Sequence, residues 1–499
     1  MRKTWVTAFA VAVVTAAALP AVAAASPETP AWGDCPADVA KPGLECGTLQ
    51  VPLDYRNPGG TQIDLTISRV ASTKPAARRG VLLTNPGGPG DGGLNFPALL
   101  RDNGLPQSVL DSYDVIGFDP RGVGHSTPVT CDLRPDQPQP ITPPYAHNRA
   151  EVVEQADYSK TVAEQCAAAK TGPMLPYVTT ANTARDMDRI RMALGEPKIS
   201  YYGASYGTYL GSVYTTMFPE RSDRIVLDSN MGPGGYDSTG IRLIARGMQD
   251  RFPDFAKFAA ADPEKYQLGS TAAQVTAKFY ELVDRLDRTP VQGFDGATLR
   301  LYTLFVLYTN DQFPTLAETW HALDTGRPPP AAGAAAAEAG DNNFASHFAV
   351  LCADSRWPKS IETYQRHVVL DRARYPMLGG ATANVTPCAF WPTAPIEPPV
   401  RIGDRGPSNV LMVQNLRDPG TPVSGARQLR RAFGDRARMV TVDQGGHGVY
   451  VFAPNKCGND AVTDYLATGK RPAHDRFCAA EPAPAPGSSA SRQAALPLG

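Results

Sequence analysis

The sequence carries almost no net charge and has few of the patterns that mark a nucleic-acid-binding or membrane protein. Lys and Arg number 48 against 49 Asp and Glu, which gives a formal net charge of −1, and no strongly charged block occurs. This balance gives no electrostatic basis for binding nucleic acid or an anionic membrane. Beyond the N-terminal residues, no apolar stretch is long enough to span a bilayer. We therefore expect a globular mature protein with neither as a partner.

The one strongly apolar stretch lies at the N-terminus. Two basic residues precede an apolar run from about Trp5 to Ala18, and small residues follow. A basic start, a short apolar core and an A-x-A-type site form the pattern of a secretory signal peptide, removed here after Ala23 or Ala25. The run is short for a membrane anchor, and no cysteine near the cleavage region would carry a lipid. The sequence therefore predicts a secreted protein.

The spacing of the eight cysteines does not suggest a metal site. No C-x-x-C or H-x-x-x-H spacing occurs, so a zinc site is not expected. All eight cysteines follow the signal peptide, and an even number in an exported chain predicts disulfides. Proximity in sequence favours four pairs: Cys35–Cys46, Cys131–Cys166, Cys352–Cys388 and Cys457–Cys478.

The stretch Gly203-Ala-Ser-Tyr-Gly207 carries the strongest chemical signal. β-prone residues 199–202 precede it, and a helical pattern follows as far as Met217. Alone, the pentapeptide could be an ordinary Gly/Ser turn. Between a strand and a helix, with another apolar strand at residues 224–228, it is typical of a nucleophile elbow, which exposes a serine to a base and a carbonyl. We therefore expect Ser205 to be a nucleophile.

A glycine-rich loop, Asn85-Pro-Gly-Gly-Pro-Gly-Asp-Gly-Gly93, follows an expected buried strand. Two interpretations compete. Its glycines satisfy G-x-G-x-x-G, the pattern of a dinucleotide site, but Pro89 interrupts the turn and an exported protein has little access to nicotinamide cofactors. The favoured interpretation is an oxyanion loop, in which Gly87 and Gly88 offer backbone N–H groups to the substrate oxygen beside the N–H of Tyr206.

A base and an acid follow two later strands. Of the seven histidines, only His447 comes after an expected strand at the end of the sheet, residues 438–443, and it lies among glycines. We predict that His447 is the general base. Asp418, on the loop after the strand at residues 409–414, gives the chain order Ser, Asp, His of α/β-hydrolases. The alternative for Asp418 is a turn former before a proline.

The order of elements predicts an α/β-hydrolase fold, a mostly parallel sheet with an inserted helical lid. We expect a signal peptide over residues 1–25, the first part of the core over 26–230, the lid over 231–400, the second part of the core over 401–478 and a disordered tail over 479–499. A lid of this kind controls substrate access.

Several motifs of the chain together match one family. They span almost the whole mature chain and are Asn85-Pro-Gly-Gly-Pro-Gly90, Asp119-Pro-Arg-Gly-Val-Gly-His-Ser126, Gly203-Ala-Ser-Tyr-Gly207, Cys352-Ala-Asp354, Asp418-Pro-Gly-Thr-Pro422 and Gly445-Gly-His-Gly448. With these the chain resembles the secreted tripeptidyl aminopeptidases of actinobacteria, within the prolyl-aminopeptidase-like α/β-hydrolases. The resemblance implies a serine exopeptidase that acts on peptides with free N-termini, without metal or cofactor. Pro86 stands where the intracellular prolyl enzymes carry histidine, so their preference for proline is not implied.

Three questions stay open at this level. An aminopeptidase must hold the substrate's ammonium, and Asp354 is a candidate carboxylate, although a surface position at a helix end would explain it equally well. The same triad would serve a carboxylesterase or lipase-like hydrolase, because the lid decides between them. Asp119 and Arg121 fit a bracing role in their loop better than a catalytic one.

Overall fold

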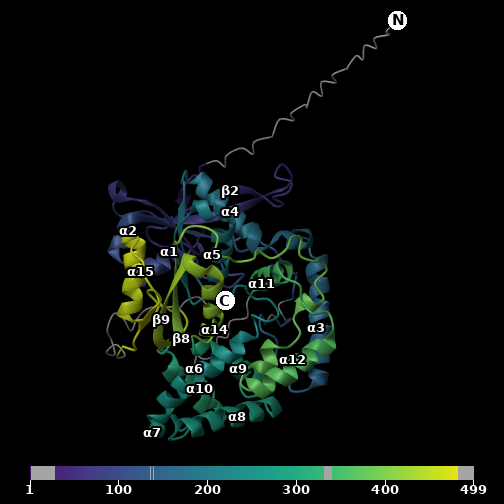
Figure 1. Ribbon diagram of the computed structural model, residues 1–499. Coiled ribbons are helices and arrows are strands. Elements are labelled where there is room, and N and C mark those ends of the chain that lie inside the picture. Colours follow the sequence, from purple (N-terminus) through teal and green to yellow (C-terminus); the bar gives the residue numbers. More distant parts are fainter. Residues whose placement is uncertain (2–28, 135, 139, 331–339, 482–499) are drawn as a thin grey trace.

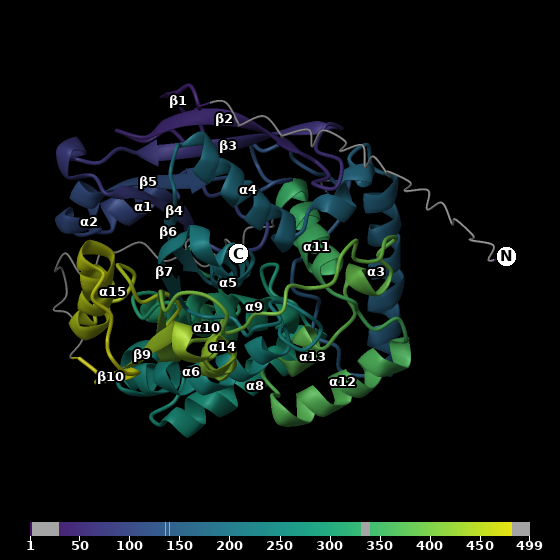
Figure 2. The same ribbon diagram turned by 45° about the horizontal axis from the view of Figure 1, so that its top comes forward.

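The computed structural model describes residues 1, 29–134, 136–138, 140–330 and 340–481. The expected signal peptide and most of the expected tail therefore lie outside the described residues. Figure 1 shows a sheet with helices on both faces and a helical body next to it. Figure 2 shows the same arrangement from another side.

Ten strands form one sheet in the order β1-β2-β3-β5-β4-β6-β7-β8-β9-β10. The pairings from β1 through β3 to β5 are antiparallel, and every pairing from β5 to β10 is parallel. The sheet is therefore mostly parallel, as expected. The strands are β1 Gly33–Asp34, β2 Glu45–Pro52, β3 Gln62–Val70, β4 Gly80–Asn85, β5 Tyr113–Phe118, β6 Ile199–Ala204, β7 Ser222–Asp228, β8 Val410–Arg417, β9 Ala437–Gly445 and β10 Arg476–Cys478.

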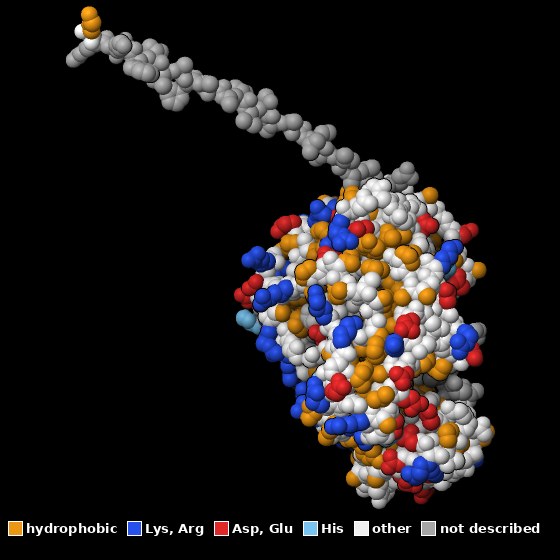
Figure 3. All heavy atoms as spheres, turned by 90° about the vertical axis from the view of Figure 1, so that its right-hand side faces the viewer, with side chains coloured by type: hydrophobic (Ala, Val, Ile, Leu, Met, Phe, Trp, Pro, Cys, Tyr) orange, Lys and Arg blue, Asp and Glu red, His pale blue; other side chains and the backbone are white. Residues whose placement is uncertain are grey.

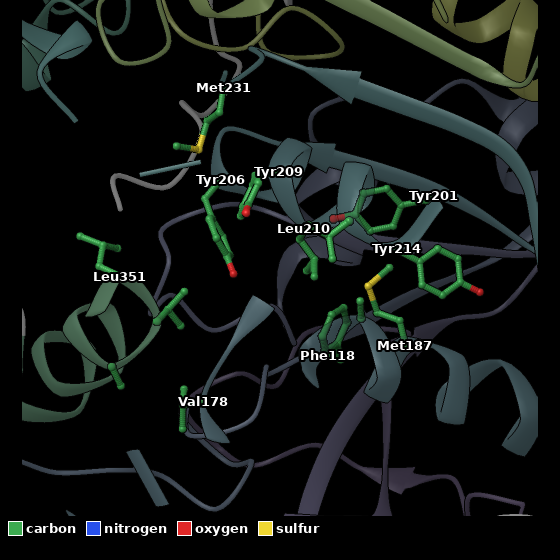
Figure 4. Close-up of a cluster of buried hydrophobic side chains, with 14 of the residues drawn as sticks. Phe118, Val178, Met187, Tyr201, Tyr206, Tyr209, Leu210, Tyr214, Met231 and Leu351 are labelled. Atoms are coloured by element: carbon green, nitrogen blue, oxygen red, sulfur yellow. The ribbon is translucent and has the colours of Figure 1, made fainter. Parts of the chain in front are cut away.

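Helices cover both faces of the sheet because successive strand residues point to opposite sides. Leu82 packs with one cluster and Leu83 with another. The first cluster contains α1 (Phe96–Asp102), α2 (Gln107–Ser112) and α15 (Lys456–Thr468), and the second contains α4 (Thr180–Ala193), α5 (Tyr206–Met217) and α14 (Val423–Phe433). Figure 4 shows part of the second cluster, where Leu210 of α5 and Met187 of α4 lie near Phe118.

Helices α6 to α13 all belong to the segment between β7 and β8, inside the range expected for the lid. Several of them share a hydrophobic core of their own, in which Phe252 and Phe279 stack on Trp320. The helices are α6 Leu243–Ala260, α7 Pro263–Tyr266, α8 Ala272–Arg288, α9 Gly296–Val306, α10 Phe313–Asp324, α11 Asp341–Asp354, α12 Ile361–Arg374 and α13 Gly379–Thr382.

One further helix joins this body from an earlier part of the chain. α3, Arg149–Ala168, precedes the elbow in sequence, yet its Val152 and Ala156 pack with Tyr364 and Val368 of α12. The helical body therefore includes residues from outside the range 231–400, which the sequence pattern did not indicate.

The four disulfides join the pairs that spacing predicted: Cys35–Cys46, Cys131–Cys166, Cys352–Cys388 and Cys457–Cys478. Cys131–Cys166 ties the loop after β5 to α3, and Cys457–Cys478 ties α15 to β10. Four disulfides in one chain are typical of proteins that fold in an oxidising compartment outside the cytosol.

The surface carries charges of both signs. On the face in Figure 3, Lys and Arg side chains occur together with Asp and Glu among apolar and uncharged ones, in keeping with the formal net charge of −1. Among the helices that the structure describes, none combines the length and apolarity that crossing a membrane requires.

Candidate active site

Ser205 lies in the sharp turn between β6 and α5. Its φ of 55° and ψ of −126° fall in a region that non-glycine residues rarely adopt. The turn needs a small neighbour, because a Cβ on Gly207 would stand 2.7 Å from the carbonyl oxygen of Asn85 in β4. The strand, the strained serine and the helix form the elbow that the sequence predicted.

Asp418 and His447 lie on the loops that follow β8 and β9. Nδ1 of His447 is 2.9 Å and 3.0 Å from the two carboxylate oxygens of Asp418. Asp418 also accepts hydrogen bonds from the backbone N–H groups of Gly420 and Thr421. Since a carboxylate can only accept, Nδ1 carries the hydrogen and Nε2 keeps its lone pair. The pair is buried, with His447 4% and Asp418 1% exposed.

Ser205 and His447 line the same cavity, which has a volume of about 50 Å³. The elbow serine and the imidazole therefore face a common space at the carboxyl ends of the parallel strands, where ligands bind in sheets of this kind. The other residues that line this cavity are Gly88, Ile141, Thr142, Tyr236, Ile241, Ile244, Leu304, Phe305, Tyr308 and His347. Many of these come from the segment between β7 and β8, which the sequence predicts to form the lid, and no sequence motif marks them.

The glycine-rich loop after β4 approaches the elbow closely. A Cβ on Gly87 would stand 2.8 Å from Cβ of Ser205, and its φ is 130°, so this position favours glycine. The N–H of Gly87 donates to Oδ1 of Asn85 at 3.1 Å. Gly88 lines the cavity, and Tyr206 is the first residue of α5, where a backbone N–H has no acceptor within the helix. The N–H groups of Gly88 and Tyr206 therefore stay candidates for hydrogen bonds to an oxyanion, and that of Gly87 has an acceptor in Asn85.

The interpretation of this loop as a dinucleotide site does not fit the structure. The loop does not open a helix at its glycines, because α1 begins only at Phe96. Instead Gly90 packs against α11, and a Cβ there would stand 2.8 Å from the carbonyl oxygen of Asn343.

Asp119 and Arg121 brace their loops, as expected. Asp119 accepts hydrogen bonds from the backbone N–H groups of Gly93 and His125. Arg121 forms a fully buried ion pair with Asp186 of α4 at 2.6 Å. Neither side chain lines the cavity of Ser205.

Contacts on two sides hold the loop that carries His447. The backbone N–H of His447 donates to the carbonyl oxygen of Tyr308 at 2.8 Å. The ring centroids of Tyr308 and His447 are 4.6 Å apart. Tyr308 follows α9 of the lid. On the sheet side, Asp228 at the end of β7 accepts from the N–H groups of Val449 and Tyr450, and burial raises the pKa of its carboxyl to about 6. The sequence alone gave no signal for either contact.

Asp354, the candidate for the substrate amine, lies at the end of α11. Its Oδ1 accepts the backbone N–H of Thr180 at 2.8 Å and its Oδ2 accepts the hydroxyl of Thr180, at the start of α4. Burial raises the pKa of this carboxyl to about 7. Asp354 lines two small cavities, and Tyr236 lines both one of these and the Ser205 cavity.

An elbow serine and a buried Asp–His pair after successive parallel strands define a serine hydrolase of the α/β-hydrolase fold. Comparison with known proteins then identifies the family. The chain is 37% identical over 475 residues to the tripeptidyl aminopeptidase of Streptomyces lividans, covering 91% of this chain and 87% of that protein. The chain belongs to the tripeptidyl aminopeptidase family.

Other matches agree with this family and show its breadth. The serine protease Hip1 of Mycobacterium tuberculosis is 29% identical, over 87% of each chain. A Mycobacterium tuberculosis protein named carboxylesterase B is 30% identical, over 90% of this chain and 89% of that protein. A family model described as TAP-like protein matches residues 375–478, which contain both Asp418 and His447.

Proposed function

We propose that this protein is a secreted aminopeptidase that releases short peptides, tripeptides in the simplest case, from the free N-termini of peptide substrates. The observation that carries the proposal is the buried Asp418–His447 pair, whose imidazole shares one cavity with the elbow serine. The relation to a protein named tripeptidyl aminopeptidase supports the choice of substrate class. Four disulfides and the signal-peptide pattern support secretion.

The reaction proceeds through an acyl-enzyme on Ser205. His447 takes the hydroxyl proton on Nε2 as Oγ attacks the scissile carbonyl, and Asp418 stabilises the imidazolium that forms. The N–H groups of Gly88 and Tyr206 donate hydrogen bonds to the carbonyl oxygen and stabilise the negative charge that develops there. His447 then gives the proton to the leaving amine, and a water molecule activated by the same imidazole releases the acyl group.

The lid supports an exopeptidase over an endopeptidase. Residues 231–400 supply apolar walls, including Ile244, Leu304 and Phe305, to the cavity around the serine. A partly enclosed site of this kind favours the end of a peptide over the middle of a long chain.

The test compares three substrates: Ala-Ala-Ala-p-nitroanilide, its N-acetyl form and p-nitrophenyl acetate. We expect kcat/KM to be much higher for the free peptide than for the acetylated one, with intact Ala-Ala-Ala as the product by mass spectrometry. Equal rates on the free and blocked peptides would contradict the proposal.

A carboxylesterase is the second candidate, because a relative of 30% identity bears that name and the same triad cleaves esters. Ester hydrolysis without cleavage of any free-amine peptide would favour it. Labelling of Ser205 by a fluorophosphonate probe distinguishes both enzymes from a non-catalytic binding protein on the same fold.

A further inference from the structure

Between the glycine-rich loop and α11, the wall of the cavity contains a histidine that no motif marks. His347 is 5% exposed and lines the cavity together with Ser205. Its Nδ1 is 2.9 Å from the carbonyl oxygen of Pro89, and because a carbonyl only accepts, Nδ1 carries the hydrogen. Nε2 therefore has a free lone pair, and it has no hydrogen-bond partner among the residues that the structure describes.

A second buried acceptor, the carboxylate of Asp91, lies two residues after Pro89 in the same loop. Oδ1 of Asp91 accepts from Nδ2 of Asn343 at 2.7 Å. Oδ2 is buried and, within the described part of the chain, neither accepts a hydrogen bond nor pairs with a Lys, Arg or His. The carboxyl carbon lies 3.4 Å from the position that a Cβ on Gly88 would occupy, and Gly88 itself lines the cavity.

The two acceptors belong to one local arrangement. Asn343 and His347 are four residues apart on α11, so they share one face of the helix. Through them this face contacts the loop from Pro89 to Asp91. The arrangement thus joins a loop of the sheet core to a helix of the lid next to the catalytic serine.

The chemistry of these two groups limits what they can bind. Both Oδ2 of Asp91, when ionised, and Nε2 of His347 can only accept, so a group that binds to either atom must donate. Burying an ionised carboxylate without a cation is unfavourable, because the charge loses its hydration and no ion pair compensates for that loss. Burial raises the pKa of Asp91 to about 6 and lowers the pKa of His347 to about 4, so near neutral pH the carboxyl is ionised and the imidazole is neutral.

We propose that Oδ2 of Asp91 and Nε2 of His347 bind the N-terminal ammonium of the peptide substrate. This inference rests on the proposed aminopeptidase function and adds the residues that recognise the free amine. The geometry favours this pair over Asp354, because both oxygens of Asp354 already accept from Thr180, whereas Oδ2 of Asp91 and Nε2 of His347 have no partner among the described residues.

The test measures the ratio of kcat/KM for Ala-Ala-Ala-p-nitroanilide to that for its N-acetyl form. Asp91→Asn keeps the size of the side chain but removes its charge, so the ratio should fall by roughly tenfold or more, as expected for the loss of one charge-assisted hydrogen bond. His347→Phe removes the acceptor and should lower the same ratio by a smaller factor. Fluorophosphonate labelling of Ser205 in each variant confirms that the site is intact.

Asp354→Asn is the matched comparison, since it removes a carboxyl of the lid whose oxygens are already occupied. It should keep the ratio of the parent enzyme. A ratio unchanged in Asp91→Asn, or a selective fall in Asp354→Asn instead, would overturn the inference. A parent enzyme with no preference for the free amine would instead refute the proposed function, so the two failures are distinct.

Discussion

The sheet core and the helical lid meet at one cavity but contribute different things to it. The core supplies the predicted reacting groups, each at the end of a strand: Ser205 after β6, Asp418 after β8 and His447 after β9. The lid supplies apolar walls, including Phe305, and the acceptor on His347. The reacting groups act on every substrate, whereas the walls act only on substrates large enough to touch them. Substitutions in the core should therefore affect all substrates alike, and substitutions in the lid should not.

The largest expected effect is that of Ser205→Ala in the core. Without the nucleophile no acyl-enzyme can form, so kcat should fall by roughly 10⁴-fold or more on the peptide and on p-nitrophenyl acetate alike. Steady-state assays on both substrates measure it, and thermal unfolding checks that the fold is intact. Activity near that of the parent on either substrate would refute the assignment.

Asp418→Asn should have the next largest effect. The side-chain amide can donate to Nδ1 of His447, which would then hold the imidazole in the wrong tautomer, and kcat should fall by about 10³- to 10⁴-fold on both substrates. The N–H groups of Gly420 and Thr421 keep an acceptor in the variant, so the melting temperature should change little. A loss of less than tenfold would show that Asp418 is only a turn former.

Phe305→Ala tests the lid side of the comparison. Removing the ring deletes apolar contact worth about 1.5–3 kcal/mol when fully made, so kcat/KM for the tripeptide substrate should fall by roughly tenfold, and by much less for p-nitrophenyl acetate. Phe258→Ala serves as the control, because Phe258 packs in the core of the lid against Phe313 and does not line the cavity. Equal losses on both substrates in Phe305→Ala would remove the distinction between core and lid.

The smallest expected effect on activity is that of Asp354→Asn, which should instead change how stability depends on pH. Burial raises the pKa of its carboxyl to about 7, whereas an unfolded Asp titrates near 4. Between about pH 4 and pH 7 the folded protein therefore keeps a proton that the unfolded chain has lost, so this group makes the free energy of unfolding fall as pH rises. In Asp354→Asn that fall should be shallower. Urea unfolding from pH 4 to pH 8 measures it, and identical slopes would contradict the burial argument.

Much of the core could be predicted from sequence because its signals are local. The elbow needs a strand, a helix and small residues within a short stretch, and the acid and base each directly follow a strand. The disulfide pairs could be predicted because each joins cysteines close in sequence. The oxyanion role of Gly87 stays a prediction, and the structure adds that its N–H donates to the side chain of Asn85, two residues away.

The features that escaped prediction depend on contacts between distant parts of the chain. Asp91 and Asn343 are 252 residues apart in sequence, yet the side chain of Asn343 donates a hydrogen bond to that of Asp91. α3 joins the lid through packing against α12, and nothing in its own residues shows which body it will cover. Tyr308 reaches the His447 loop through a backbone carbonyl, a group that every residue carries, so no residue type marks this position.

The bond from His447 to the carbonyl of Tyr308 limits how freely the two bodies could be recombined. Because Tyr308 of the inserted segment holds the loop of His447, the predicted general base, we expect a truncated protein that kept only the sheet to lose the alignment of this imidazole along with its specificity. A chimaera with the inserted segment of another hydrolase would need an equivalent turn after α9, the fourth helix of that segment. We therefore expect that the inserted segment cannot be removed without disturbing the loop of His447.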